Sequence, residues 1–500
     1  VYSDGAGSGA AIVDAFASLN VVDLKVQDDL TVTDDVSVGG DAAVTGALTG
    51  GTVNNVGILA DTTNFTDSIL ISQNASTGTL SSATNNTGLG DSVFAALTSG
   101  TNNVAIGSGA LDANTTASNN TALGYRAGTT TTTGADNVAV GSDALFANTT
   151  GASNVAIGHD ALGENTTASN NTAVGMSALV QNTTGDENTA VGALSLDANT
   201  TGTDNTALGY QSLSANTTAS NNVSIGRKAM LVNTTGDQNT AVGAQSLDAN
   251  TTGSNVVAVG YQALSANTTG HSNVAVGHTA LQLSTTAVRN TSVGASSLDA
   301  NTTGNDNTAC GTSALGGNTT ASENTAVGSQ ALEANTTGGA NTALGMRAME
   351  ATTTGGNNTA VGVFAMGVNT TGQFNVAMGA NALDANTTGS ENVAIGRLSL
   401  SANTTADNNT ACGVQALMVN TTGENNSAFG AASLDANTTG DQNTGFGYGT
   451  LTSNTTANNN TAVGFSALLL NTTGTRNTAV GSLAGDAITT GSNNVAVGDN

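Results

Sequence analysis

The sequence contains no Trp and no Pro, and only 3% of its 500 residues are aromatic, which excludes a core built on large rings. Its 8 Lys and Arg face 35 Asp and Glu, a net charge of −27. This excludes a nucleic-acid partner, because phosphate binding depends on clustered basic side chains. Apolar runs stay shorter than the about 18 residues of a membrane-spanning helix, so we expect no membrane insertion. Two cysteines are too few for a disulfide framework.

A five-residue phrase, such as Asn-Thr-Ala-Val-Gly or Asn-Val-Ala-Ile-Gly, returns every 17 residues from Asn86 to Asn494. The intervening 408 residues hold 24 units of 17 without insertion or deletion. When this Asn is numbered position 1, position 5 is Gly in every unit and position 1 departs from Asn only at Val256. Such strict spacing predicts that each unit stacks on the next in a fixed register.

The recurring Gly, Thr and Asn disfavour a helix. We predict two short strands per unit, at positions 2–4 and about positions 8–11, with turns at the Gly of position 5 and at the Asn-Thr-Thr-Gly segment. One unit is then one coil, and the predicted fold class is all-β, an elongated β-solenoid or β-roll. At about 4.8 Å per coil, 24 coils extend over roughly 115 Å.

Alternation along the strands divides core from surface. Position 4 is mostly Val, Ile or Leu and position 9 mostly Leu or Met, so we assign both rows to the core. Positions 3 and 8 hold small residues almost throughout and never a charge, and we expect these faces to be buried against other chains. Because one large aliphatic per strand makes a thin core, association would supply the missing burial, and we predict a homotrimer.

The variable positions 6, 7, 10, 16 and 17 are predicted to form solvated ridges, where another molecule would be recognised. They carry most of the basic and ring-bearing side chains of the repeats: Arg126, Arg227, Lys228, Arg289, Arg347, Arg397, Arg476, His159, His271, His278, Tyr125, Tyr210, Tyr261 and Tyr448. A longer rhythm places LDANTT at Leu196, Leu247 and Leu298, each 51 residues apart. Duplication in blocks of three units is favoured over a chain that makes three 17-residue faces per turn.

The chain offers little catalytic material. His159 and Asp160 are adjacent, but neighbouring strand or turn side chains usually diverge, so no catalytic pair is expected. Cys310 and Cys412 stand at position 4, six units apart, and are predicted to be buried free thiols. HExxH, CxxC pairs, Walker loops and calcium-binding nonapeptides are absent. We therefore predict no enzyme and assign no catalytic, cofactor-binding or metal-binding residue.

The Asn-Thr-Thr phrase of positions 12–14 matches the N-glycosylation acceptor in most units, for example at Asn114, Asn148, Asn165 and Asn182. Asn ladders that bond from coil to coil explain the same residues and are favoured, since glycans about 4.8 Å apart would clash. Ice binding by Thr arrays is disfavoured, because alternation sends the two adjacent Thr to opposite faces.

Four segments are expected: 1–22, an attachment or leader segment with a short apolar stretch; 23–53, a hexad-repeat β-stalk; 54–85, a junction; and 86–500, the shaft. The stalk phrases LKVQDD, LTVTDD, VSVGGD and AAVTGA repeat apolar residues at their first and third places. Its pairs Asp28–Asp29 and Asp34–Asp35 are either Ca²⁺ ligands or, as we favour, solvated turn residues. Because the chain begins at Val1 without a basic leader, it is expected to be processed or incomplete there, and more protein or another subunit is expected after Asn500.

The phrases NVAIG and NTALGY, each followed by a small-Leu pair and an Asn-Thr-Thr-Gly turn, resemble two families. One is the head repeat of trimeric autotransporter adhesins, a parallel β-roll of three chains, and the other is the shaft of bacteriophage tail fibres. The stretch LTVTDDVSVGG also resembles phage fibre stalks. The resemblance covers 86–500 and, more weakly, 24–53.

The resemblance implies a structural fibre protein, a homotrimeric rod on a virion that spaces and contacts the host surface. Other virion or appendage subunits at its termini and a host cell-surface receptor are the implied partners. The alternative is a bacterial surface adhesin or a self-assembling extracellular filament, which changes the location from virion to cell surface. A polysaccharide-degrading enzyme is disfavoured, because its carboxylates would gather in a groove and here they are scattered over ridges.

Overall fold

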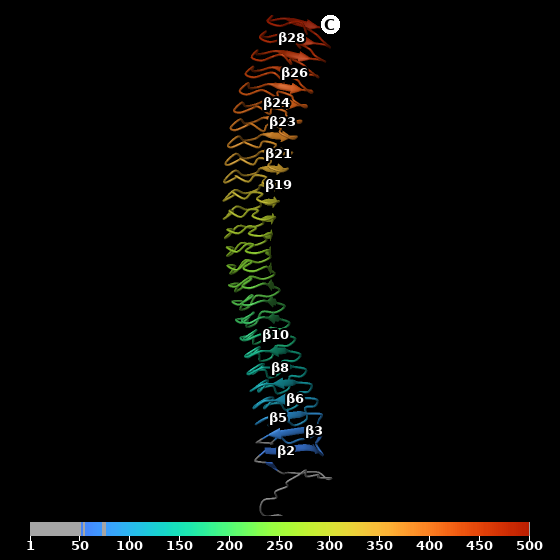
Figure 1. The fold of residues 1–500 in the computed structure, drawn as a ribbon, viewed down its shortest axis with the longest axis vertical. Helices are drawn as coiled ribbons and strands as arrows, with labels where there is room; N and C mark the ends of the chain where they lie inside the picture. Colours follow the sequence, from blue (N-terminus) through green and yellow to red (C-terminus); the bar gives the residue numbers. More distant parts are fainter. Residues whose placement is uncertain (1–51, 54–55, 73–76, 500) are drawn as a thin grey trace, which may run out of the picture. The chain divides into compact units, whose positions relative to one another are not determined.

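The computed structural model describes residues 52–53, 56–72 and 77–499, which belong to one compact unit. In this part of the chain all regular elements are β-strands and there is no helix, hence none with the length and apolar character of a membrane span (Figure 1). The predicted all-β solenoid of 17-residue coils is confirmed. The leader, the hexad stalk up to residue 51 and the pairs Asp28–Asp29 and Asp34–Asp35 lie outside the described residues.

Four strands precede the coils, and one strand then occurs in each of 25 coils. Their bounds are β1 (Thr52–Val53), β2 (Val56–Thr62), β3 (Phe65–Ser72), β4 (Ala83–Thr84), β5 (Thr87–Leu89), β6 (Val104–Ile106), β7 (Thr121–Leu123), β8 (Val138–Val140), β9 (Val155–Ile157), β10 (Thr172–Val174), β11 (Thr189–Val191), β12 (Thr206–Leu208), β13 (Val223–Ile225), β14 (Thr240–Val242), β15 (Val257–Val259), β16 (Val274–Val276), β17 (Thr291–Val293), β18 (Thr308–Cys310), β19 (Thr325–Val327), β20 (Thr342–Leu344), β21 (Thr359–Val361), β22 (Val376–Met378), β23 (Val393–Ile395), β24 (Thr410–Cys412), β25 (Ser427–Phe429), β26 (Thr444–Phe446), β27 (Thr461–Val463), β28 (Thr478–Val480) and β29 (Val495–Val497).

Each coil strand pairs in parallel with the strands of the coils before and after it, in a register of 17 residues. Thr172 of β10 faces Val155 of β9 on one side and Thr189 of β11 on the other. One turn of the solenoid therefore takes one unit, and the alternative of three faces per turn is wrong. The 51-residue rhythm is a repeat of sequence over three coils.

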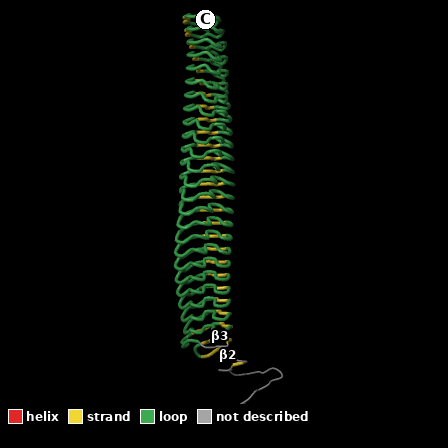
Figure 2. Tube along the Cα trace, turned by 90° about the vertical axis from the view of Figure 1, so that its left-hand side faces the viewer, coloured by secondary structure: helices red, strands yellow, loops and turns green. Residues whose placement is uncertain are grey.

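The second strand expected at positions 8–11 is absent: in the coils, positions 6–11 form turns and positions 12–17 an irregular loop (Figure 2). These turns are still bonded from coil to coil: Leu145 N–H donates to Ala161 O over 2.9 Å and Thr149 N–H to Thr166 O over 2.8 Å. Left-handed backbone at positions 7, 9 and 17 interrupts an extended conformation, as at Leu145, where φ is 54°. At position 5 a side chain has no room, because a Cβ on Gly141 would lie 2.5 Å from Gly158 O.

The core lies on the other side of the strand from the one expected. Position 3 is buried, as at Ala139 and Ala156, whereas position 4 points outward and leaves Ile157 39% exposed. The small residues of positions 3 and 8 thus face the chain's own interior, where they meet the predicted core row of position 9, as at Leu145. The coil is so narrow behind its three-residue strand that little more than a Cβ fits there.

Positions 3 and 8 compensate each other in volume. Where position 3 is Gly88, position 8 is the larger Val93, and a Cβ on Gly88 would lie 3.0 Å from Val93 Cγ1. Where position 3 is Gly445, position 8 is Thr450, whose Oγ1 would lie 2.6 Å from such a Cβ. In these two coils the larger residue at position 8 fills the space that the glycine at position 3 leaves.

Two columns of buried Asn hold the coils together. At position 12, Asn165 Nδ2 donates to Asn148 Oδ1 of the preceding coil over 3.0 Å and to Ala168 O of its own coil over 3.0 Å. At position 1, the backbone N–H of Asn154 donates to Asn137 Oδ1, and Asn154 Nδ2 donates to the same Ala168 O, each over 2.9 Å. The Asn ladder favoured from the sequence is confirmed.

A β-hairpin covers the strand edge of the first coil. β2 and β3 pair antiparallel, and β3 pairs in parallel with β5 through Ile69 and Thr87. Phe65 and Leu70 of β3 are fully buried against the first coils. The hairpin thereby occupies an edge that would otherwise be open to pairing with another chain.

Candidate functional site

Among the described residues, an exposed and uncharged surface runs along the outer side of the coil strands. It is formed by positions 2 and 4 of β5 to β29. We call it the strand face. Position 4 carries an apolar residue in all 25 coils: Leu89, Ile106, Leu123, Val140, Ile157, Val174, Val191, Leu208, Ile225, Val242, Val259, Val276, Val293, Cys310, Val327, Leu344, Val361, Met378, Ile395, Cys412, Phe429, Phe446, Val463, Val480 and Val497.

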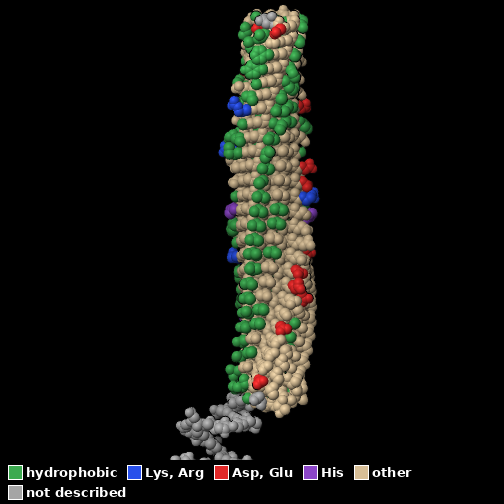
Figure 3. Space-filling view, turned by 90° about the vertical axis from the view of Figure 1, so that its right-hand side faces the viewer, with side chains coloured by type: hydrophobic (Ala, Val, Ile, Leu, Met, Phe, Trp, Pro, Cys, Tyr) green, Lys and Arg blue, Asp and Glu red, His purple; other side chains and the backbone are tan. Residues whose placement is uncertain are grey.

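All of these side chains are at least partly open to solvent: Leu208 is 36% exposed and Phe446 56%, whereas several valines, such as Val140 and Val327, are of intermediate exposure. Position 2 is Thr, Val or Ser throughout, so the strand face carries no charge from Thr87 to Val497. In Figure 3 hydrophobic side chains gather in a column along the coils, and most acidic and basic side chains in view lie at its margins. A monomeric protein rarely exposes an apolar patch of this continuity.

The two cysteines belong to this face. Cys310 is exposed and Cys412 is partly exposed, so the expectation that both are buried thiols is wrong. The reason is the orientation of position 4, which points away from the core in every coil. Both are free thiols, as expected.

The ridges beside the strand face are open, as predicted from their variable sequence. At position 6, Tyr261 stacks on His278 of the next coil with ring centroids 5.5 Å apart, and Tyr448 stacks on Phe465 at 5.6 Å. The exposed fractions of Tyr448 and Phe465 are 59% and 55%. Because successive coils keep the same register, side chains at one ridge position form columns and interact along the solenoid.

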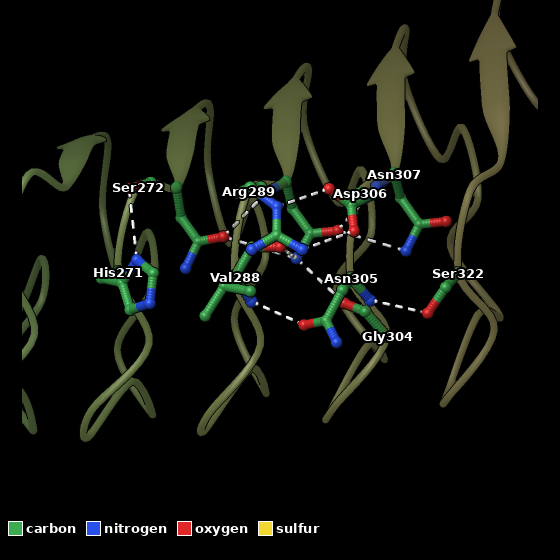
Figure 4. A network of polar contacts seen from close by, with 11 residues as sticks. His271, Ser272, Val288, Arg289, Gly304, Asn305, Asp306, Asn307 and Ser322 are labelled. Atoms are coloured by element: carbon green, nitrogen blue, oxygen red, sulfur yellow. Dashed lines mark hydrogen bonds and ion pairs between the residues drawn. The ribbon is translucent and has the colours of Figure 1, made fainter.

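The ridge of positions 16 and 17 carries an ion pair between coils (Figure 4). Arg289 donates from Nε to Asp306 Oδ1 over 2.7 Å and from Nη2 to Asp306 Oδ2 over 2.8 Å. This bidentate pair raises the pKa of Arg289 and lowers that of Asp306. Beside it, Asn305 Oδ1 accepts from the Val288 N–H and the Asn305 N–H donates to Ser322 Oγ. These contacts link successive coils along the ridge.

His159 and Asp160, expected to diverge, point toward each other. Their atoms Nδ1 and Oδ2 are 2.9 Å apart, and both side chains lie on an open ridge. The left-handed conformation of Asp160, with φ of 55°, turns its side chain back toward that of the preceding residue. Sequence adjacency alone did not predict this turn.

Half-buried carboxylates recur at position 10. Burial raises the pKa of six of them, and at several positions hydrogen bonds lower the pKa by a smaller amount. These six residues are Asp112, Asp197, Asp248, Asp299, Asp384 and Asp435. They are at least three coils apart, as the 51-residue rhythm requires. Single carboxylates at such intervals do not form an acid–base pair with one another.

The Asn-Thr-Thr segments present their Thr, not their Asn, to solvent. Asn114, Asn148, Asn165 and Asn182 are fully buried, so the folded chain offers no amide to a glycan. The Thr of position 13 is also engaged, because its hydroxyl donates to the carbonyl of the same position in the next coil, as in Thr149 to Thr166 over 3.0 Å.

No protein-family model and no curated protein matches the chain.

Proposed function

We propose that this chain is a structural fibre protein whose solenoid is a rigid, homotrimeric rod. The observation that carries the proposal is the uncharged apolar strand face, which continues through all 25 coils. We first expected the small residues of positions 3 and 8 to form the contact between chains, but they are buried inside the coil. We now propose the strand face as the contact surface, because its apolar side chains are open to solvent.

The size of the strand face suits an interface between chains. At about 4.8 Å per coil and about 10 Å for three strand residues, 25 coils present on the order of 1,200 Å² per chain. In a trimer the face is shared between two neighbours, on the order of 600 Å² for each, so one contact buries on the order of 1,200 Å² in total, which is the lower end of the range for stable interfaces. The occupant we propose is a second and third copy of this chain, because only an equally long and regular surface matches the coil spacing over the whole length.

Charge favours the same occupant. The chain carries a net charge of −27, which would oppose association between copies if the carboxylates lay on the contact surface. They lie instead on the ridges and at position 10, and the strand face is free of them. Copies that meet at this face keep their acidic residues apart and in solvent.

We place the rod on a virion, as a phage tail fibre that spaces and contacts the host surface. This assignment rests on the resemblance of the NTALGY and NVAIG phrases to fibre shafts and, for three chains, to trimeric adhesin heads. Contact with a host receptor would involve the ridges, where sequence varies from coil to coil. The alternative is a bacterial surface adhesin or extracellular filament, and we propose no catalytic activity for either.

A charge placed on the strand face tests the assembly. We expect Val293→Asp, which lies at position 4 and is 38% exposed, to convert trimers into monomers in size-exclusion chromatography with light scattering. Val368→Asp is the matched control, since Val368 is a 46% exposed Val at position 11, outside the face. A wild-type chain that is monomeric at micromolar concentration, or equal loss of trimer in both variants, would contradict the proposal.

Immunogold electron microscopy with antibodies against the chain separates the two locations. Label on filaments at virion tails supports the tail fibre, whereas label on cell envelopes or on free extracellular filaments supports the alternative. Incubation with host surface polysaccharide tests the absence of catalysis, and the appearance of new reducing ends would contradict it.

A further inference from the structure

A second site lies on a ridge of coils 120–170, and it is independent of the fibre proposal. A hollow of about 250 Å³ opens there, and its lining includes Arg126, Asp143, Asp160, Gly163 and Glu164. Asp143 and Asp160 occupy position 7 in successive coils and therefore stack one above the other. His159 stands beside Asp160 at position 6.

From this arrangement we propose that Asp143, His159 and Asp160 bind one divalent transition-metal ion of the zinc class. One ligand atom from each of the three residues lies within 4.8 Å of the other two. This is the one such group of His, Cys, Asp and Glu among the residues that the structure describes. Ligand atoms about 2.0–2.2 Å from a common ion are about 3–3.5 Å apart, so small side-chain rotations bring the set onto one ion.

The pair His159–Asp160 already has the separation that two ligands of one ion need. Nδ1 and Oδ2 are 2.9 Å apart, which is about the distance between two ligands at right angles around such an ion. The third ligand comes from the neighbouring coil, so the ion would join two coils.

The donor set selects the class of metal. An imidazole nitrogen with two carboxylate oxygens suits zinc and related transition metals, whereas Ca²⁺ and Mg²⁺ prefer oxygen alone. The three residues leave at least one coordination position for water, because the side chains of Asp160 and His159 are 37% and 60% exposed. Glu164, exposed on the rim, adds negative charge to the same hollow.

A glycine that the backbone does not require opens the hollow. Gly163 takes position 10, where the coils before and after it carry Phe146 and Val180. A Cβ on Gly163 would come no closer than 3.3 Å to any atom, and its φ is not left-handed, so a side chain would fit. The space beside the two carboxylates is therefore a feature of the sequence at this coil and not a demand of the fold.

Arg126 holds one of the ligands in place and limits the affinity. Its Nη2 lies 2.7 Å from Asp143 Oδ1, and its guanidinium carbon lies 4.9 and 4.8 Å from the ring centroids of Tyr125 and Phe146. Ser142 Oγ donates to Asp143 Oδ2 over 3.1 Å. The two contacts fix the Asp143 side chain, while the positive charge of Arg126 opposes a cation.

Titration calorimetry of the tag-free full chain with ZnCl₂ tests the site. We expect one Zn²⁺ per chain, and binding weakened by at least about tenfold in His159→Gln and in Asp160→Asn, since even loss of an outer-shell partner weakens metal sites by that factor. His278→Gln is the matched control, because His278 is also exposed at position 6, but the residue after it is Thr279 and it belongs to no group of three metal-ligating side chains. It should bind Zn²⁺ as the wild type does.

Two results would overturn the site: wild-type binding no stronger than that of His159→Gln, or equal weakening by His278→Gln. Gly163→Val gives a second measurement that leaves all three ligands in place. It fills the hollow, and we expect it to reduce Zn²⁺ affinity while circular dichroism and trimer formation stay those of the wild type. Unchanged Zn²⁺ affinity in Gly163→Val would show that the hollow does not contribute to metal binding.

Discussion

Asn165 and Asn148 form one step of a ladder in which each side-chain amide donates to the oxygen of the preceding one, here over 3.0 Å. The same Asn165 amide also donates to Ala168 O, so it closes its own coil and joins it to the next. Both residues are fully buried, where an amide without partners would be strongly unfavourable. The ladder therefore enforces the 17-residue period, because an insertion would displace an Asn from its neighbours.

The ladder has gaps, and filling one should stabilise the solenoid. Ser284 stands at position 12, leaving Asn267 Oδ1 without a partner and Asn301 Nδ2 bonded to Gly304 O alone. Ser284→Asn restores both steps, and we expect it to raise the free energy of unfolding by about 1 kcal/mol per bond formed. The unfolding temperature of this variant is compared with that of the control Ser329→Asn, which makes the same substitution at position 6, on a ridge outside the ladder. Equal unfolding temperatures in the two variants would show that the ladder adds no stability.

The pair Gly445–Thr450 provides a test of the narrow core. A Cβ on Gly445 would lie 2.6 Å from Thr450 Oγ1 and also collide with Ser433 Oγ, so we expect Gly445→Ala to destabilise by about 1–3 kcal/mol. The double variant Gly445→Ala/Thr450→Ala recreates the Ala–Ala pair of most coils and should recover most of that loss. Denaturant unfolding of the single and double variants measures the coupling. Additive effects would mean that the two positions do not share one volume.

The fold was predictable because the 17-residue period and the Gly of position 5 recur in every unit, and the Asn of the ladder in most units. Which face of the strand points into the core was not predictable. Hydrophobicity assigned Ile157 to the core and Ala156 to an interface between chains, whereas the structure buries Ala156 in the core and leaves Ile157 exposed. Alternation defines two faces but does not say which is inside. The deciding quantity is the space behind the strand, which depends on how sharply positions 5–9 turn. The contact between His159 and Asp160 was missed because it also depends on the backbone of this turn. The left-handed conformation of Asp160 brings the two neighbouring side chains together.

The half-buried Asp435 should make stability fall as pH rises. Burial raises its pKa above the ordinary 3.8, so the folded chain holds this proton more tightly than the unfolded chain. Its contribution to stability is complete below 3.8 and is lost as pH rises through the folded pKa. Asp435→Asn should therefore be more stable than the wild type at pH 7 and nearly equal to it at pH 3, as measured by urea unfolding.

Asp306 supplies the control of opposite sign. Its pKa is lowered by the bond to Arg289, so its contribution is present above 3.8 and is lost as pH falls through the folded pKa. Asp306→Asn should be less stable than the wild type at pH 7, with the difference shrinking toward pH 3. The same sign in both variants would mean that net charge, and not the local environment, sets their pH dependence.

The native thiols report how copies align at the strand face. In a parallel, in-register trimer, Cys310 of one chain lies at the height of Cys310 in the next, and the same holds for Cys412. The two positions are six coils apart, or about 29 Å, so a short bismaleimide cannot join one to the other. We expect covalent dimers in the wild type, in Cys310→Ser and in Cys412→Ser, and none in the double variant. A single variant that fails to cross-link while its trimer persists would indicate an antiparallel or staggered arrangement, because only in-register chains bring each cysteine to its own equivalent.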